Sequence, residues 1–358
     1  MTKELDFKIP FSGFAATTFI NCFASTYLFL ENIAITRISE YPCNQRDAGQ
    51  CDGCGNCGNT AVAMQERWFF LFDTMCGRSS LRCRFDGQPT EMQNMICETD
   101  FYDGGTNDTV DFLFGFAGYE YRKLNDPAAF QGAVVASINA GKPVIAKVPA
   151  GAGHFRVLTG YDGDTLICPD FSNAQGKPQG APSYDELVAL YVVGEKIAPR
   201  HTFRDGLERI RRVMEYNIRE NLWGGYTEKM GLYTSDSLGK ASPEERKARM
   251  KRVADTMWHT FNSHNFAEVF RKRDVEELKD PALDEICAKI GGPYYGYTHD
   301  LAWALIGLEE RADWTRHYAG YFGEMVELTL SQIAKNDIAV LEAIERALEI
   351  LNRKNNKA

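Results

Sequence analysis

The chain has 358 residues, of which 44% are hydrophobic and 25% are charged, so it is long enough for one large or two ordinary globular domains. Its formal net charge of −9, with no broad basic stretch, argues against nucleic acid as the main partner.

The first thirty residues resemble neither a signal peptide nor a membrane span. The segment MTKELDFKIP mixes acidic and basic residues, unlike a signal peptide. The apolar run over 14–30 contains Thr17, Asn21 and Ser25, which makes it too polar for a membrane span. Aromatic and aliphatic residues recur there at three- and four-residue steps, which predicts a buried helix over 14–35. We therefore expect a cytoplasmic protein without a membrane partner.

A cysteine-rich loop follows this helix. The stretch YPCNQRDAGQCDGCGNCGN, residues 41–59, is rich in Gly, Asn and Asp and has no periodicity. Its C-x-x-C-x-x-C spacing allows several thiolates to converge on one ion, so we expect a structural zinc site or an iron–sulfur cluster. The alternative is a set of reduced or disulfide-forming surface cysteines. The four candidate ligands are Cys43, Cys51, Cys54 and Cys57.

Three consecutive strands are predicted within GKPVIAKVPAGAGHFRVLTGYDGDTLICPD, residues 141–170. They cover 143–148, 155–161 and 165–168. His154 opens the second strand, and Asp170 lies just past the third. In a twisted antiparallel sheet such a pair can meet at one sheet end, where a carboxylate can orient an imidazole.

The character of the sequence changes near residues 198–202, because strand signals disappear. Amphipathic helices are predicted over 203–223, 242–272, 299–313 and 316–352, with the loop GPYYGYT at 292–298 between two of them. We therefore expect an α+β domain over 1–198, which includes the cysteine-rich loop, and an all-α domain over 199–358.

Cys22, His154 and Asp170 form a candidate catalytic triad. A thiolate is the nucleophile in such a site, and a neighbouring imidazolium and a helix N-terminus both favour it. Each residue also has a structural interpretation: a lone cysteine in an apolar helix is usually an inert core residue. His154 can be a satisfied strand histidine, and Asp170 can be a turn former.

These residues carry a resemblance to a known superfamily. The stretches GTNDTVDFLFGFAGYEYRKL, INAGKPVIAKV and GHFRVLTGYDGDTLICPD resemble the C-terminal half of bacteriocin-processing double-glycine cysteine peptidases. The stretch INCFASTYLFLE, followed by a helical tail, is similar to the butirosin biosynthesis protein H group. The resemblance implies a papain-like fold with Cys22 as nucleophile, His154 as base and Asp170 as the acid that orients the histidine. The oxyanion-hole Gln of papain-like peptidases is replaced by Ala16. Asn21 is the candidate donor, with Thr17, Thr18 and the backbone N–H groups of Cys22 and Phe23 as the alternatives.

The expected function is that of a cysteine-nucleophile acyltransferase or amide/thioester hydrolase. The substrate expected from the resemblance is a small-molecule or carrier-bound acyl donor. The alternatives are a cysteine peptidase and a catalytically inactive papain-like binding protein with a structural metal loop. In the helical tail, His259, His264, His299 and His317 indicate either helix packing or a lid or acyl-carrier docking surface. Self-association through this tail into a homo-oligomer is a further expectation.

Overall fold

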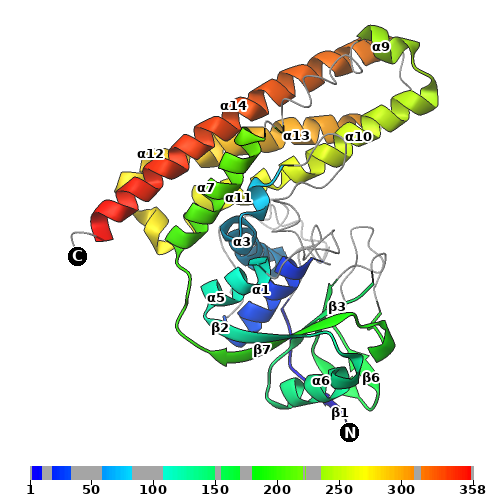
Figure 1. Cartoon of the computed structure of the whole chain (residues 1–358), viewed down its shortest axis with the longest axis vertical. Coiled ribbons are helices and arrows are strands. Elements are labelled where there is room, and N and C mark those ends of the chain that lie inside the picture. The colour runs from blue at the N-terminus through cyan, green and yellow to red at the C-terminus, as the bar shows by residue number, and fades with distance from the viewer. Residues whose placement is uncertain are drawn as a thin grey trace, which may run out of the picture. The chain divides into compact units, whose positions relative to one another are not determined.

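The computed structural model describes residues 2–9, 18–33, 59–82, 108–149, 155–169, 180–220, 222, 235–309 and 316–355. The chain divides into two compact units. The first comprises Met1–Phe72, Thr99–Asp103 and Val110–Arg200, and the second comprises Asp73–Glu98, Gly104–Thr109 and His201–Ala358. All described strands lie in the first unit, and the described parts of the second are helical (Figure 1). The expected α+β character with C-terminal helices is thereby confirmed.

The first unit is built on a four-stranded antiparallel sheet with the order β2-β7-β3-β4. Its strands are β2 (Tyr119–Leu124), β3 (Val144–Lys147), β4 (Phe155–Leu158) and β7 (Ala189–Lys196). β3 pairs with β4 from Val144 opposite Leu158 to Lys147 opposite Phe155. The first residue of β4 therefore lies beside the last residue of β3, at one end of these two strands.

A second, three-stranded sheet has the order β1-β5-β6. It contains β1 (Thr2–Glu4), β5 (Gly160–Asp162) and β6 (Thr165–Ile167). The segment predicted as one strand over 155–161 is therefore two strands, β4 and β5, in different sheets. The backbone of Thr159 already pairs with Ile167 and Leu5 of the small sheet. A Cβ on Gly160 would lie 2.6 Å from the carbonyl oxygen of Lys3, so the close approach of β1 requires glycine there.

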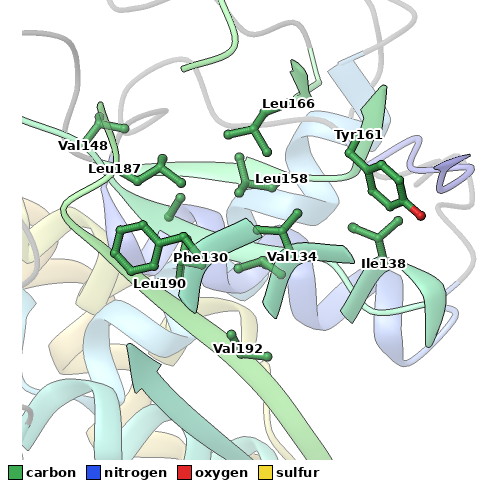
Figure 2. Packing of buried hydrophobic residues seen from close by; sticks show 12 residues of the cluster. Phe130, Val134, Ile138, Val148, Leu158, Tyr161, Leu166, Leu187, Leu190 and Val192 are labelled. Carbon is green, nitrogen blue, oxygen red and sulfur yellow. The ribbon is translucent and has the colours of Figure 1, made fainter. Parts of the chain in front are cut away.

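Helix α6 (Phe130–Asn139) covers one face of the main sheet. It is preceded by a short turn, η3 (Pro127–Ala129), where the Asp126 side chain accepts a hydrogen bond from the backbone N–H of Ala128. Figure 2 shows Phe130, Val134 and Ile138 of this helix packing with Leu158 and Leu190 of the strands, all of them buried. The alternation of β4 places Leu158 and Arg156 toward this layer and Phe155 toward the other face.

The other face is covered by an aromatic layer from α1 (Phe19–Leu30). The Phe19 ring contacts the rings of Phe155 and Tyr191, at centroid distances of 5.5 Å and 5.0 Å. The Phe23 ring contacts Phe72 of α3 (Asn59–Met75) and Phe114 of α5 (Asp108–Ala117), at 5.0 Å and 4.9 Å. These edge-to-face pairs fix the orientation of α1 against the sheet and against α3 and α5.

The described residues of the second unit are mostly helical (Figure 1). Helix α7 begins with a capping box, in which the side chains of Thr202 and Asp205 satisfy each other's backbone N–H groups. The α-helices are α7 (Phe203–Arg219), α9 (Ser235–Lys240), α10 (Pro243–Phe261), α11 (Ser263–Lys272), α12 (Asp284–Lys289), α13 (Tyr295–Glu309) and α14 (Arg316–Asn355). The remaining short 3-10 turns are η2 (Arg78–Ser80), η4 (Tyr184–Glu186), η6 (Glu276–Lys279) and η7 (Pro281–Leu283), of which η4 belongs to the first unit.

The prediction of a loop over 292–298 is wrong, because this segment is helical. Residues Ile290–Tyr294 form a π-helical turn, η8, and α13 begins directly at Tyr295. The carbonyl oxygen of Tyr294 accepts hydrogen bonds from the Thr298 hydroxyl and the Asn336 amide, at 2.9 Å and 3.1 Å. These two bonds stabilise a helix start that the Gly- and Tyr-rich sequence does not predict.

Two buried polar networks tie residues 73–82 to the helices of the second unit. Arg82 is fully buried and forms a bidentate ion pair with Asp337, which also accepts a hydrogen bond from Tyr295 at 3.0 Å. Asp73 pairs with Arg78 at 2.8 Å and accepts a hydrogen bond from Asn265 at 2.8 Å.

Among the helices that the structure describes, none is long and apolar enough to cross a lipid bilayer.

Candidate active site

Cys22, the predicted nucleophile, lies in the first turn of α1. Thr18 caps the helix, and its hydroxyl oxygen accepts a hydrogen bond of 3.2 Å from the backbone N–H of Asn21. The backbone N–H of Cys22 donates to the carbonyl oxygen of Thr18 at 3.1 Å. The Cys22 side chain has no exposed surface. The sulfur is therefore near the positive end of the helix dipole and is shielded from solvent.

Asn21, the predicted oxyanion donor, is bound to a residue of another helix. Gln65 of α3 is fully buried, and its amide nitrogen donates a short hydrogen bond to the side-chain oxygen of Asn21. The same nitrogen lies 3.2 Å from the Ser25 hydroxyl oxygen, one turn further along α1. These contacts fix the orientation of the Asn21 amide, with its oxygen toward α3.

A buried arginine interacts electrostatically with two thiols of the first unit. Arg156 of β4 is 3% exposed, and its Nη1 donates to the carbonyl oxygen of Phe155 at 2.8 Å. Burial lowers the pKa of its guanidinium, while the thiols of Cys22 and Cys168 act in the opposite direction. Burial raises the pKa of the Cys168 thiol to about 12, against the opposing effect of Arg156.

Only part of the predicted triad lies among the described residues. Cys22 is described, whereas His154 and Asp170 lie outside the described residues. His154 directly precedes Phe155 in the sequence, and Asp170 follows Cys168 by two positions. The four predicted metal ligands, Cys43, Cys51, Cys54 and Cys57, also lie outside the described residues.

Gln65 and Arg156 are residues that the sequence interpretation missed. Gln65 falls on the apolar side of its helix, four residues after Ala61 and three before Trp68, where a polar side chain is an anomaly. Arg156 interrupts the apolar strand FRVL. A buried polar residue in an apolar pattern is the signal that could have identified both.

The second unit contains a separate cavity of about 800 Å³. Its polar lining includes His264, Glu268, His299, Asp300 and Gln332. Burial, and then the neighbouring His299, lower the pKa of His264 to about 4. Burial raises the pKa of Glu268, but hydrogen bonds from Arg271 and Lys272 outweigh it and bring the value to about 2. At neutral pH this cavity therefore presents a neutral imidazole beside an ionised carboxylate.

No protein-family model matches the chain, and no curated protein matches it.

Proposed function

We propose that the chain is a cysteine-nucleophile acyltransferase or amide/thioester hydrolase with a papain-like first unit. Cys22 is the nucleophile, His154 the base and Asp170 the residue that orients the histidine. The observation that supports this proposal is the packing of the first turn of α1 on the start of β4. The centroids of the Phe19 and Phe155 rings lie 5.5 Å apart. In the sequence, Cys22 follows Phe19 by three residues, and His154 directly precedes Phe155.

The proposed reaction has two steps. His154 takes the Cys22 proton, and the thiolate attacks the acyl carbonyl carbon to form a tetrahedral intermediate. The bond to the leaving group then breaks, the leaving group takes the proton from His154, and a thioester remains on Cys22. In the second step an amine or water gives a proton to His154 and attacks the thioester, which releases the acyl product and the Cys22 thiolate. The thiolate recovers the proton from His154.

Two features of α1 bear on the charges in this reaction. The positive end of its dipole and the Arg156 guanidinium both favour negative charge on the Cys22 sulfur, whereas the complete burial of Cys22 opposes it. The Cys22 backbone N–H already bonds Thr18, so we assign the oxyanion donor to the Asn21 side-chain amide, oriented by Gln65. Loss of one oxyanion donor typically costs about 2.7–4 kcal/mol in the barrier.

The full burial of Cys22 favours a second candidate function. Reactive cysteines are generally partly exposed, whereas buried structural cysteines are inert. Cys22 is 0% exposed, so acylation requires a movement that opens a path to the sulfur. Without such a movement, the first unit is a catalytically inactive binding module.

Covalent acylation tests the proposed function directly. The chain is incubated with a p-nitrophenyl ester or a small thioester, and its intact mass is followed by mass spectrometry. We expect one acyl adduct per chain in the native protein and none in Cys22→Ala. The matched control is Cys76→Ala, which removes a buried thiol of the second unit whose pKa burial raises to about 12.

An adduct of unchanged yield in Cys22→Ala would contradict the assignment of the nucleophile. The absence of an adduct in the native chain, with Cys22 intact by peptide mapping, would favour the inactive binding module.

A further inference from the structure

We propose that His264 and His299 form a binding site for a divalent transition-metal ion in the cavity of the second unit. This site is distinct from the cysteines of residues 41–59 and does not depend on the proposed acyl transfer. His264 lies in α11 and His299 in α13, and both line the cavity.

The distance between the two imidazole rings suits one shared ion. Their centroids lie 4.6 Å apart, with an angle of 41° between the ring planes. An ion bound by a ring nitrogen lies about 3.2 Å from the ring centroid, the sum of a metal–nitrogen bond of about 2.1 Å and the ring radius. At the observed separation, two such rings subtend about 90° at the ion, an angle within the range of octahedral and distorted tetrahedral coordination.

The Asp300 carboxylate contacts the His299 ring and orients it. Its Oδ1 lies 3.0 Å from Nδ1 of His299. A hydrogen bond from Nδ1–H to the carboxylate assigns the tautomer that leaves the Nε2 lone pair for a metal ion. Metal-binding histidines commonly have such a carboxylate partner, which fixes the ring and raises its basicity.

Two carboxylates contribute negative charge to the cavity. Glu268 lies one helical turn after His264, and Asp300 adds a second carboxylate. Among the described residues that line the cavity, there is no lysine or arginine. Arg271 and Lys272 form ion pairs with the Glu268 carboxylate, at 2.6 Å and 3.0 Å. The charge that favours a cation is therefore that of Asp300 rather than that of Glu268.

The arrangement indicates an open rather than a closed metal site. In the part of the chain that is described, no three His, Cys, Asp or Glu side chains are grouped to hold an ion. Two imidazoles therefore supply the protein ligands, and water fills the other positions. Gly292 of η8 leaves room for these waters, since nothing lies within 4 Å of a Cβ placed on it. Imidazole ligands suit zinc, copper, nickel and iron.

Titration of the full-length chain with Ni²⁺, followed by calorimetry and absorption spectroscopy, tests this proposal. Thiolate-bound Ni²⁺ absorbs strongly in the near ultraviolet and imidazole-bound Ni²⁺ does not, which separates this site from the cysteine-rich loop. We expect a saturable component without thiolate absorption. His264→Gln and His299→Gln should each weaken it by at least about tenfold, and Asp300→Asn by about 10- to 100-fold. The control His201→Gln should leave it unchanged.

Unchanged Ni²⁺ affinity in all three variants, or binding that is entirely thiolate in character, would overturn the proposal. Circular dichroism checks that each variant is folded. Asp300 has a side chain that is 73% exposed, so Asp300→Asn keeps the test decisive if the histidine variants fail to fold.

Discussion

At the level of single residues, His264 makes stability depend on pH. Its pKa is about 4 in the folded chain and 6.5 in the absence of the fold. Between these values the unfolded chain binds a proton that the folded chain does not. The stability that His264 contributes is therefore complete above pH 6.5 and is lost as the pH falls toward 4.

Replacing this residue should flatten that dependence. We expect native stability to fall by up to about 3 kcal/mol between pH 6.5 and pH 4 through this residue alone. Urea unfolding at a series of pH values, with a chelator present, measures the effect. His264→Gln should show a smaller fall than the native chain over this window, and His201→Gln the same fall as the native chain. Parallel curves for native chain and His264→Gln would contradict the expected burial of the neutral imidazole.

Some residues of the candidate site can be predicted from the sequence and others cannot. Cys22 stands out because its chemistry is distinctive and its helix is strongly periodic. Gln65 does not, because its partner comes from a segment far away in the chain: Gln65 bonds Asn21, 44 residues earlier. A sequence pattern shows that a polar side chain will be buried, but the contact that satisfies it depends on tertiary packing.

At the level of elements, the π-helical turn η8 depends on Gly291. A Cβ at this position would lie 2.8–3.0 Å from atoms of Arg271, two of which belong to the backbone of α11. We expect Gly291→Ala to destabilise the chain by about 1–3 kcal/mol, as overpacking does. Gly292→Ala is the matched control, because its added methyl group meets nothing within 4 Å. Thermal unfolding of both variants provides the comparison, and equal stability of the two would contradict the close packing of η8 on α11.

Element boundaries were predicted where local signals are strong. Strands β3 and β6 lie within the ranges expected from the apolar runs, and α7 begins at a recognisable capping box. The division of 155–161 into β4 and β5 was not predicted, because Thr159 exchanges sheets through backbone bonds to Leu5 and Ile167. The helix over 242–272 likewise breaks near Asn262, between α10 and α11, within an otherwise continuous amphipathic pattern.

At the level of the whole chain, the second unit depends on a buried ion pair between distant segments. Arg82 and Asp337 are 255 residues apart, and their side chains are 0% and 2% exposed. Removal of one partner leaves the other charge buried, so we expect Arg82→Met to cost about 3–5 kcal/mol. The exposed pair of Lys240 and Asp236 is the control, and Lys240→Met should change stability by less than about 0.5 kcal/mol. Urea unfolding measures both changes, and similar midpoints for the two variants would count against the role of the buried pair.

The organisation into an α+β part followed by helices could be predicted because the hydrophobic period changes along the chain. The incorporation of residues 73–98 and 104–109 into the second unit could not. It depends on contacts such as the one between Arg82 and Asp337, which have no local signature. The papain-like fold and the acyl-transfer chemistry stay proposals that follow from Cys22, His154 and Asp170.

The most direct test of these proposals is the order in which iodoacetamide modifies the cysteines of the folded chain at pH 7. Peptide mapping gives a rate for each thiol. An activated nucleophile predicts that Cys22 reacts well before Cys76, whose pKa burial raises to about 12, and that His154→Ala slows Cys22 alone. Two results would contradict the proposed catalytic role. One is modification of Cys22 only after denaturation, and the other is an equal rate of Cys22 modification in the folded native chain and in folded His154→Ala.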